Sequence, residues 1–309
     1  MIFNEILELY SLLDRPGRVA PLVASLFEKE KQQLKITRVT GDQGKTDFVK
    51  IIIPGKNGKT NGGKSPTIGI IGRLGGIGAR PDRIGFTSDG DGALSALSAA
   101  LRLTRMKNLG DELLGDVIIA THLCTDAPTE SHDPVPFMGS PVDLNTMNKY
   151  EVDPDMDAIL SIDTSRGNRI INTTQFAISP TVKEGWILKV SDDLLSIMEY
   201  TTGKLPFVLP ISMQDITPYG NDLYHFNSIM QPAIATKSPV VGVAITSEVP
   251  VPGCGTGVTN APQVDGIGRF VIEVAIAFTS GKLQFYDKKE FERIIALYGD
   301  MKVLQKVKK

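Results

Sequence analysis

Short apolar runs that alternate with helix-like segments make up most of the chain after residue 66, and this alternation constrains the fold more than any other feature. Four runs are nearly all apolar, as strands buried on both faces of a parallel sheet are. They lie at 67–71, 117–120, 158–162 and 240–245. Helical segments between such strands are typical of crossover connections in a parallel sheet. The sequence therefore predicts an α/β fold with a mixed, mostly parallel sheet sandwiched by helices.

Apolar spacing places the helices. At 92–106, Leu94, Leu97 and Leu101 recur on one helical face, and 266–278 carries a longer stripe of the same kind. Ser191 is a suitable N-cap for the next predicted helix. The remaining predicted elements are helices at 191–200 and 288–298 and strands at 186–190 and 206–211.

The first 34 residues are predicted to form a helical arm of two helices separated by Pro16 and Gly17. Strand-like runs at 34–39 and 48–53 follow, joined by a hairpin-type connection. We therefore predict a helical arm at 1–34 and a single α/β domain at 35–309. Leucines of the arm could pack on this domain or on a neighbouring subunit, so a homo-oligomer is possible.

Charge and cysteine content restrict the class of protein. The 33 Lys and Arg residues nearly balance the 35 Asp and Glu residues, which argues against a nucleic-acid-coating protein. No apolar run approaches the roughly 20 residues that span a bilayer, and the acidic N-terminus lacks the basic start of a signal peptide. Two cysteines cannot form a disulfide framework. We expect a cytoplasmic protein that acts on a small-molecule or peptide partner.

Polar residues follow each buried run, and in open α/β sheets ligands bind beyond the carboxyl ends of the strands. Asp163 comes directly after the run at 158–162. A carboxylate at such a position must be paired, hydrogen-bonded or solvated in a cleft. Asp163 is therefore a candidate metal ligand, with a turn-closing role as the alternative.

Two further positions carry metal-binding side chains. Asp89 and Asp91 lie directly before a helix and suit a divalent cation, although Asp91 could simply cap the helix and Asp89 occupy a turn. His122 and Cys124 alternate at the end of a strand, as zinc ligands or a Cys–His catalytic pair could. The alternative is that Cys124 is a small buried apolar residue.

Basic and polar residues in the other strand-end loops suggest where a substrate would bind. Arg73 and Arg80 suit a carboxylate or phosphate, although the loop at 72–78 is neither a Walker A loop nor a dinucleotide fingerprint. The polar segment at 214–225 contributes Asn221 and Asp222 as candidate substrate contacts and His225 as a candidate base.

Long strings at 72–81, 161–164, 214–221 and 228–232 resemble an uncharacterised bacterial family catalogued as domain of unknown function 1177. This resemblance covers nearly the whole chain and implies no activity. A more distant resemblance is to the co-catalytic zinc aminopeptidases of the glutamyl aminopeptidase-like group, which implies a zinc-exopeptidase-like fold. In that comparison Asp163 matches a strand-end Asp ligand, and Cys254 lies near the place of a late histidine.

The chain departs from the aminopeptidase pattern at two places. Gly72, Arg73 and Leu74 stand where the first His-x-Asp pair is expected, and the Glu-Glu pair is missing. The two-zinc site of that group cannot therefore be assembled in the same way.

Three functions remain open. The first is a metal-dependent hydrolase of a small peptide or amide-bearing metabolite, with one divalent metal, zinc by preference. Its ligands would be Asp89, His122 and Asp163 with Cys124 or Cys254, and Asp91 or His225 would be the base. The second is a non-catalytic protein that binds a small anionic ligand through Arg73 and Arg80. The third is metal-free amide chemistry by Cys124 or Cys254.

Overall fold

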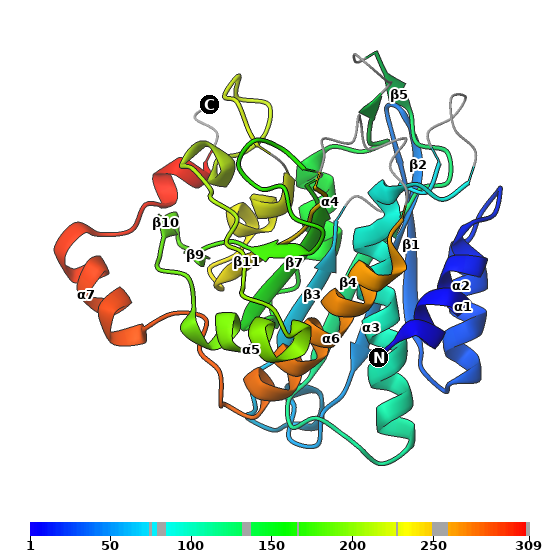
Figure 1. Cartoon of the computed structure of the whole chain (residues 1–309), viewed down its shortest axis with the longest axis horizontal. Coiled ribbons are helices and arrows are strands. Elements are labelled where there is room, and N and C mark those ends of the chain that lie inside the picture. The colour runs from blue at the N-terminus through cyan, green and yellow to red at the C-terminus, as the bar shows by residue number, and fades with distance from the viewer. Residues whose placement is uncertain are drawn as a thin grey trace.

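Four parallel strands form the centre of the structure, a computed structural model (Figure 1). The structure describes residues 1–73, 76–78, 85–131, 137–165, 167–226, 228–248 and 259–306. The four strands pair in the order β4, β3, β7, β11. Their bounds are β3 Ile68–Gly72, β4 Val117–Leu123, β7 Ala158–Thr164 and β11 Val240–Ile245. All four were predicted as buried runs, and their parallel pairing brings their carboxyl ends to one edge.

Antiparallel strands extend this centre on both sides. The predicted hairpin is confirmed as β1 (Leu34–Gly41) and β2 (Gly44–Ile53), and β2 pairs with β4. At the other side β11 pairs with two short antiparallel strands, and the outermost strand pairs with one of these. These strands are β8 Phe176–Ile178, β9 Val182–Lys183 and β10 Trp186–Ile187. A separate small ladder joins β5 (Thr129–Glu130) and β6 (Phe137–Met138). The sheet is therefore mixed and mostly parallel at its centre, as predicted.

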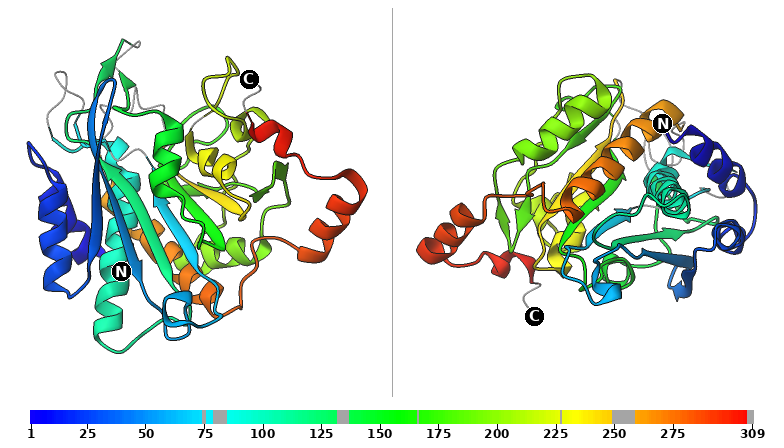
Figure 2. Two further views of the ribbon diagram at one scale, coloured as in Figure 1. Left: turned by 180° about the vertical axis from the view of Figure 1, so that it is seen from behind. Right: turned by 90° about the horizontal axis from the view of Figure 1, so that it is seen from below.

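Helices cover both faces of the sheet (Figure 2). One face packs against α3 (Asp91–Asn108) and α6 (Ala261–Thr279), together with α1 (Phe3–Leu13) and α2 (Ala20–Lys29). Buried side chains of all four helices belong to the same hydrophobic core. The opposite face carries α4 (Leu144–Glu151) and a 3₁₀ helix, η4 (Ser228–Ala235). This layering confirms the predicted sandwich.

Two further helices are present, and buried residues of the first, Leu194, Ile197 and Met198, belong to the same core. In α5 (Asp192–Thr202) the Leu194 N–H donates to the Ser191 hydroxyl, which confirms the predicted N-cap. The predicted helix at 288–298 is present as α7 (Lys288–Tyr298), which lies away from the sheet (Figure 1). In the part of the chain that the structure describes, no helix has both the length and the apolar character needed to cross a membrane.

The predicted strand at 206–211 is wrong. Only Val208 forms an isolated bridge, to Ile178. Pro206 and Pro210 lack the N–H that a strand ladder requires, so continuous pairing cannot form there. The run at 186–190 is also shorter than predicted, since only β10 remains.

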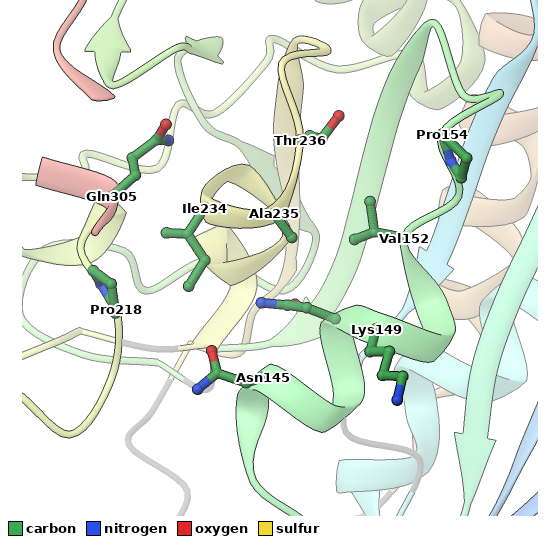
Figure 3. Close-up of a pocket in the computed structure, with 10 residues that line it drawn as sticks. Asn145, Lys149, Val152, Pro154, Pro218, Ile234, Ala235, Thr236 and Gln305 are labelled. Carbon is green, nitrogen blue, oxygen red and sulfur yellow. The ribbon is translucent and has the colours of Figure 1, made fainter. Parts of the chain in front are cut away.

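A cavity of about 460 Å³ lies beside α4, on the face that also carries η4 (Figure 3). Residues from α4, from the end of η4 and from the C-terminal 3₁₀ helix η5 (Lys302–Gln305) line it. These segments are far apart in the sequence, so the cavity is a product of the tertiary fold.

Candidate functional site

The sheet register brings three predicted site residues side by side. Gly72 pairs with Thr121 on one side and with Ile162 on the other, so the residues that follow, Arg73, His122 and Asp163, are level across three neighbouring strands. Side chains alternate between the faces of a sheet. Because Ile71 and Ile118 belong to the core on the α4 face, Arg73 and His122 point to that face too. The row lies at the carboxyl edge of the strands, where α/β proteins bind ligands.

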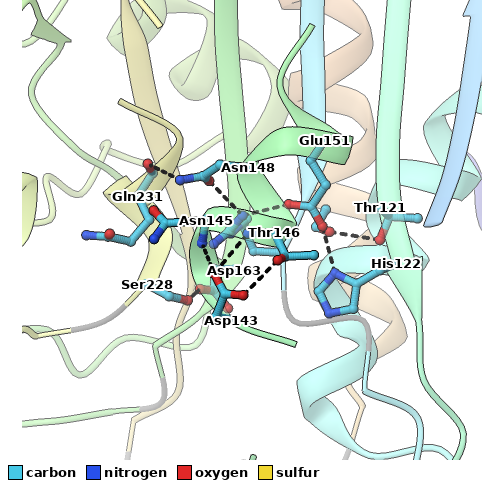
Figure 4. A network of polar contacts seen from close by, with 12 residues as sticks. Thr121, His122, Asp143, Asn145, Thr146, Asn148, Glu151, Asp163, Ser228 and Gln231 are labelled. Atoms are coloured by element: carbon cyan, nitrogen blue, oxygen red, sulfur yellow. Dashed lines mark hydrogen bonds and ion pairs between the residues drawn. The ribbon is translucent and has the colours of Figure 1, made fainter. Parts of the chain in front are cut away.

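Glu151, the last residue of α4, joins two members of this row (Figure 4). Its Oε2 accepts a hydrogen bond from Arg73 Nη1 at 2.6 Å, and its Oε1 lies 2.6 Å from His122 Nδ1. Arg73 and Glu151 are both 0% exposed and His122 is 2% exposed. An ion pair this deeply buried needs nearly complete hydrogen bonding to offset the loss of hydration. Glu151 therefore holds the guanidinium and the imidazole in fixed positions.

The charge state of Glu151 follows from these contacts. Burial opposes its ionisation, but the Arg73 charge and the His122 hydrogen bond together hold the pKa of Glu151 below its ordinary value. An ionised carboxylate can only accept hydrogen bonds. His122 Nδ1 therefore carries a hydrogen and donates a hydrogen bond to Glu151.

Asn148 supports Arg73 one helical turn before Glu151. Its Oδ1 accepts from Arg73 Nη1 at 3.3 Å, and its Nδ2 donates to the Gln231 carbonyl in η4 at 3.1 Å. Asp143 caps α4, since its carboxylate accepts the N–H groups of Asn145 and Thr146. The cap fixes the start of the helix, and the helix in turn positions Asn148 and Glu151.

Asp163 is buried on the other side of Arg73. It is 1% exposed, and its Oδ2 accepts a hydrogen bond from the Ser228 hydroxyl at 2.7 Å (Figure 4). Burial is the main cause that raises the pKa of Asp163 to about 6, and the nearby Glu151 charge acts in the same direction. The Ser228 hydrogen bond and the Arg73 charge oppose this rise. Asp163 can therefore gain or lose a proton close to neutral pH.

Arg73 keeps hydrogen-bonding capacity beyond its contacts with Glu151 and Asn148. Among the described residues, its Nε and Nη2 atoms are buried and have no hydrogen-bond partner. Buried donors are nearly always paired with protein, water or ligand. Arg73 therefore has two donors with which it can contact a ligand atom at the strand edge.

The polar loop at 214–226 joins the network through Gln231. The Gln231 amide donates to the Thr217 carbonyl at 2.8 Å. The Thr217 hydroxyl in turn contacts His225 Nε2 at 3.2 Å and accepts from Asn221 Nδ2 at 3.1 Å. Tyr219 stacks on His225 with a ring separation of 4.3 Å. Two predicted site residues, Asn221 and His225, thus lie together next to the strand-end network.

Asp222 lies apart from these contacts. It is exposed and adopts a left-handed backbone conformation with φ of 59°. Aspartate tolerates this conformation better than most residues do. Its proposed contact with a substrate stays a prediction, as do the contacts assigned to Asn221 and Arg73.

Cys124 has surroundings that disfavour its predicted metal role. Its sulphur lies 3.5 Å from the Lys45 carbonyl, and it packs with Ala127 and Met138 in a small apolar cluster. Burial raises the pKa of the Cys124 thiol to about 11. A zinc ligand or a nucleophile must be a thiolate, and this environment keeps the thiol protonated at neutral pH.

Asp89 and Asp91 begin the helix on the opposite face of the sheet. Asp89 belongs to the 3₁₀ turn Ser88–Gly90, and Asp91 is the first residue of α3. Burial and the charges of Asp14 and Asp91 raise the pKa of Tyr10 in α1, which shows that Asp91 lies towards the N-terminal helices. The next residue, Gly92, packs against the backbone of Arg73 and Ile162, so the start of α3 lies directly against the strand ends from the other face of the sheet.

The described residues contain no group of three His, Cys, Asp or Glu side chains arranged to hold a metal ion. His122 and Asp163 both lie near Arg73, and Glu151 contacts only the Nδ1 atom of the imidazole. Arg80 and Cys254 lie outside the described residues. The metal-ligand assignment to Asp89, His122, Cys124 and Asp163 thus stays a prediction.

Sequence reasoning did not find Glu151, Asn148, Ser228 and Gln231, which complete the network. Helix α4 is only eight residues long and its core-facing positions include Asn148 and Glu151. Met147 is the one apolar residue among its buried positions, so the sequence shows no apolar stripe there. The one available signal was Asp143 followed by Thr146, a capping pattern that marks the start of a helix.

Comparison with known proteins adds a family and a fold. The family model described as "Protein of unknown function (DUF1177)" matches residues 37–308. No curated protein matches the chain at a significant level. The solved structure of the bottromycin maturation enzyme BotP matches with a TM-score of 0.56 and 14% identity, covering 89% of this chain and 70% of BotP.

A second solved structure is the same enzyme in complex with Mn. It matches with a TM-score of 0.55 and 13% identity, covering 89% of this chain and 71% of that one. At these identities the likeness shows the fold alone. The resemblance to the family of unknown function is confirmed, and the resemblance to the zinc aminopeptidases stays a prediction.

Proposed function

Because the chain belongs to the DUF1177 family, whose description assigns no activity, we propose from the site itself that it is a hydrolase of a small peptide or amide-bearing metabolite. The observation that supports this most strongly is Asp163, a carboxyl at a strand end whose pKa of about 6 suits proton transfer near neutral pH. Strongly perturbed carboxyl groups are concentrated at functional sites.

In this proposal water attacks the carbonyl carbon of the amide while the Asp163 carboxylate takes the proton of that water. The same proton passes to the leaving nitrogen as the carbon–nitrogen bond breaks. The products are a carboxylate and an amine. The two remaining donors of Arg73 stabilise the negative charge that develops on the carbonyl oxygen. Ser228 orients Asp163, and Glu151 and Asn148 hold Arg73 in place.

The solved structure of BotP with Mn raises the question of a divalent metal. In the part of the chain that is described, no three His, Cys, Asp or Glu side chains come together to hold a metal ion. The Glu151 carboxylate already binds Arg73 and His122. These described residues do not fit a complete metal site, and the hydrolysis proposed above uses only Asp163 and Arg73. Metal analysis of protein purified without a histidine tag tests the predicted zinc.

The experiment that tests the hydrolase is turnover of a panel of dipeptides and N-acyl amino acids, with release of the amine as the readout. Asp163→Asn removes the proton acceptor and is expected to lower the rate at least about 100-fold. Asp155→Asn is the matched control, because Asp155 is exposed and its side chain makes no contact with the network. Equal rates for the Asp163→Asn variant and the wild type would exclude this role for Asp163.

A second candidate function rests on Arg73. Its two remaining donors match the geometry of a carboxylate, so the same edge of the sheet would hold a small anionic ligand without turning it over. Saturable binding of a dicarboxylate such as succinate, together with no hydrolysis across the panel, would favour this function over the hydrolase.

A further inference from the structure

The lining of the cavity beside α4 does not include Arg73, His122 or Asp163. Asn148 is the one residue of its described lining that also belongs to the Arg73 network, and its side chain is bonded to both Arg73 and Gln231. Asn148 thus closes the cavity from the strand edge. A volume of about 460 Å³ lies within the range of small-molecule sites.

Amide side chains enter the cavity lining from two sides. Asn145 comes from α4, and its side-chain amide makes no hydrogen bond to any described residue. Gln305 comes from η5, and its Nε2 donates to the Ala233 carbonyl at 2.8 Å, which leaves Oε1 to accept. Side-chain amides donate and accept at once, so they match the amide group of a ligand.

The rest of the described lining is apolar except for Thr236 and one cation. Val152, Pro154 and Ile234 supply apolar surface. Lys149 is the one charged residue there, and its ammonium makes no ion pair within the described part of the chain. Its Nζ lies 5.7 Å from the centre of the Tyr150 ring, and the residue is exposed. A single cation in the lining favours a ligand with one negative charge.

We propose that this cavity binds an N-acylated amino acid. The amide of the ligand would pair with Asn145 and Gln305, its side chain would contact Val152 and Ile234, and its carboxylate would meet Lys149. The proposal does not rest on the hydrolase, because neither Asp163 nor Ser228 lines the cavity.

The test is calorimetric titration of the full chain with two probes. N-acetyl-L-leucine carries the carboxylate, and N-acetyl-L-leucinamide replaces it with a neutral amide. The carboxylate probe is expected to bind about five-fold more tightly, as one exposed ion pair allows. Lys149→Gln is expected to abolish the difference between the probes. Lys237→Gln, which removes another exposed lysine outside the lining, is expected to preserve it.

A blocking variant tests the location. Ala235 is an exposed lining residue, so Ala235→Trp fills the cavity and is expected to abolish binding. Asn145→Trp blocks the cavity from the α4 side, and this variant replaces Ala235→Trp in the test if Ala235→Trp does not fold. Asp163→Asn is expected to bind normally, which separates this site from the proposed hydrolase. Absence of saturable binding to wild type, full binding by the blocked variant, or equal effects of the two lysine substitutions would overturn the proposal.

Discussion

Asp163 must destabilise the fold whenever it is ionised. Its pKa in the folded protein, about 6, is above the ordinary value of 3.8, so the folded state holds the proton more tightly than the unfolded chain does. The resulting stability is complete below about pH 4 and is lost as the pH rises through about 6. A shift of this size corresponds to about 3 kcal/mol.

Asp163→Asn is therefore expected to stabilise the protein at pH 8 by up to about 3 kcal/mol while it abolishes hydrolysis. Urea unfolding at pH 5 and pH 8 measures the first effect, and it should be much smaller at the lower pH. The wild-type rate should rise with pH and level off above about 6, because the base must be ionised. A rate that falls across this interval would show that Asp163 acts as an acid instead.

Glu151 has the opposite effect on stability, since its ionised form compensates a buried cation. Glu151→Gln leaves Arg73 without its partner and is expected to cost about 3–5 kcal/mol. Glu290→Gln, at an exposed position, should change little. The double variant Arg73→Met with Glu151→Leu removes both charges and is expected to recover part of the loss. If the double variant is no more stable than Glu151→Gln, the ion pair is not the cause.

Among the elements, α4 matters most for the site because one short helix carries both Asn148 and Glu151. Its N-cap is Asp143, and hydrogen bonds from Thr146 and the first-turn N–H groups lower the pKa of that carboxyl. Asp143→Ala is expected to cost about 1 kcal/mol and to loosen the helix that holds Arg73. The matched control is Asp287→Ala, which removes the equivalent cap of α7.

Both cap variants should lose similar stability in urea unfolding. Only Asp143→Ala is expected to change the NMR resonances of the His122 ring, since α7 carries no residue of the network. Equal effects of the two variants on His122 would mean that α4 does not position the site.

At the scale of the whole molecule, the N-terminal helices α1 and α2 share the main hydrophobic core, so we expect them to contribute to the stability of the whole fold. Leu9 is 0% exposed and lies in the same core as α3 and α6. Leu9→Ala is expected to cost about 2–5 kcal/mol, because it leaves a cavity in that core. Leu7→Ala, on the exposed side of α1, should cost far less. A Leu9→Ala protein that unfolds like wild type would show that the helical arm at 1–34 does not contribute to the stability of this core.

Much of the fold could be predicted because its central strands are continuously apolar. The runs at 240–245 and 288–298 coincide with β11 and α7 to the residue. The predicted strand at 206–211 was wrong because the segment is apolar enough for a strand, but Pro206 and Pro210 lack the N–H groups that a strand needs. Helix α4 was missed because side chains that face the interior there are polar.

Hydrophobic periodicity is a local property, so the order of residues is enough to identify the buried strands and the polar residues that follow them. This order therefore placed Arg73, His122 and Asp163 at strand ends. The level alignment of these three residues on neighbouring strands, and the contacts of Glu151 with two of them, required the folded chain. Register and helix docking depend on residues 29 to 90 positions apart. Burial and ion pairing set the charge of Asp163 and Glu151. Both depend on residues distant in the sequence, so the residues adjacent in the chain do not predict them.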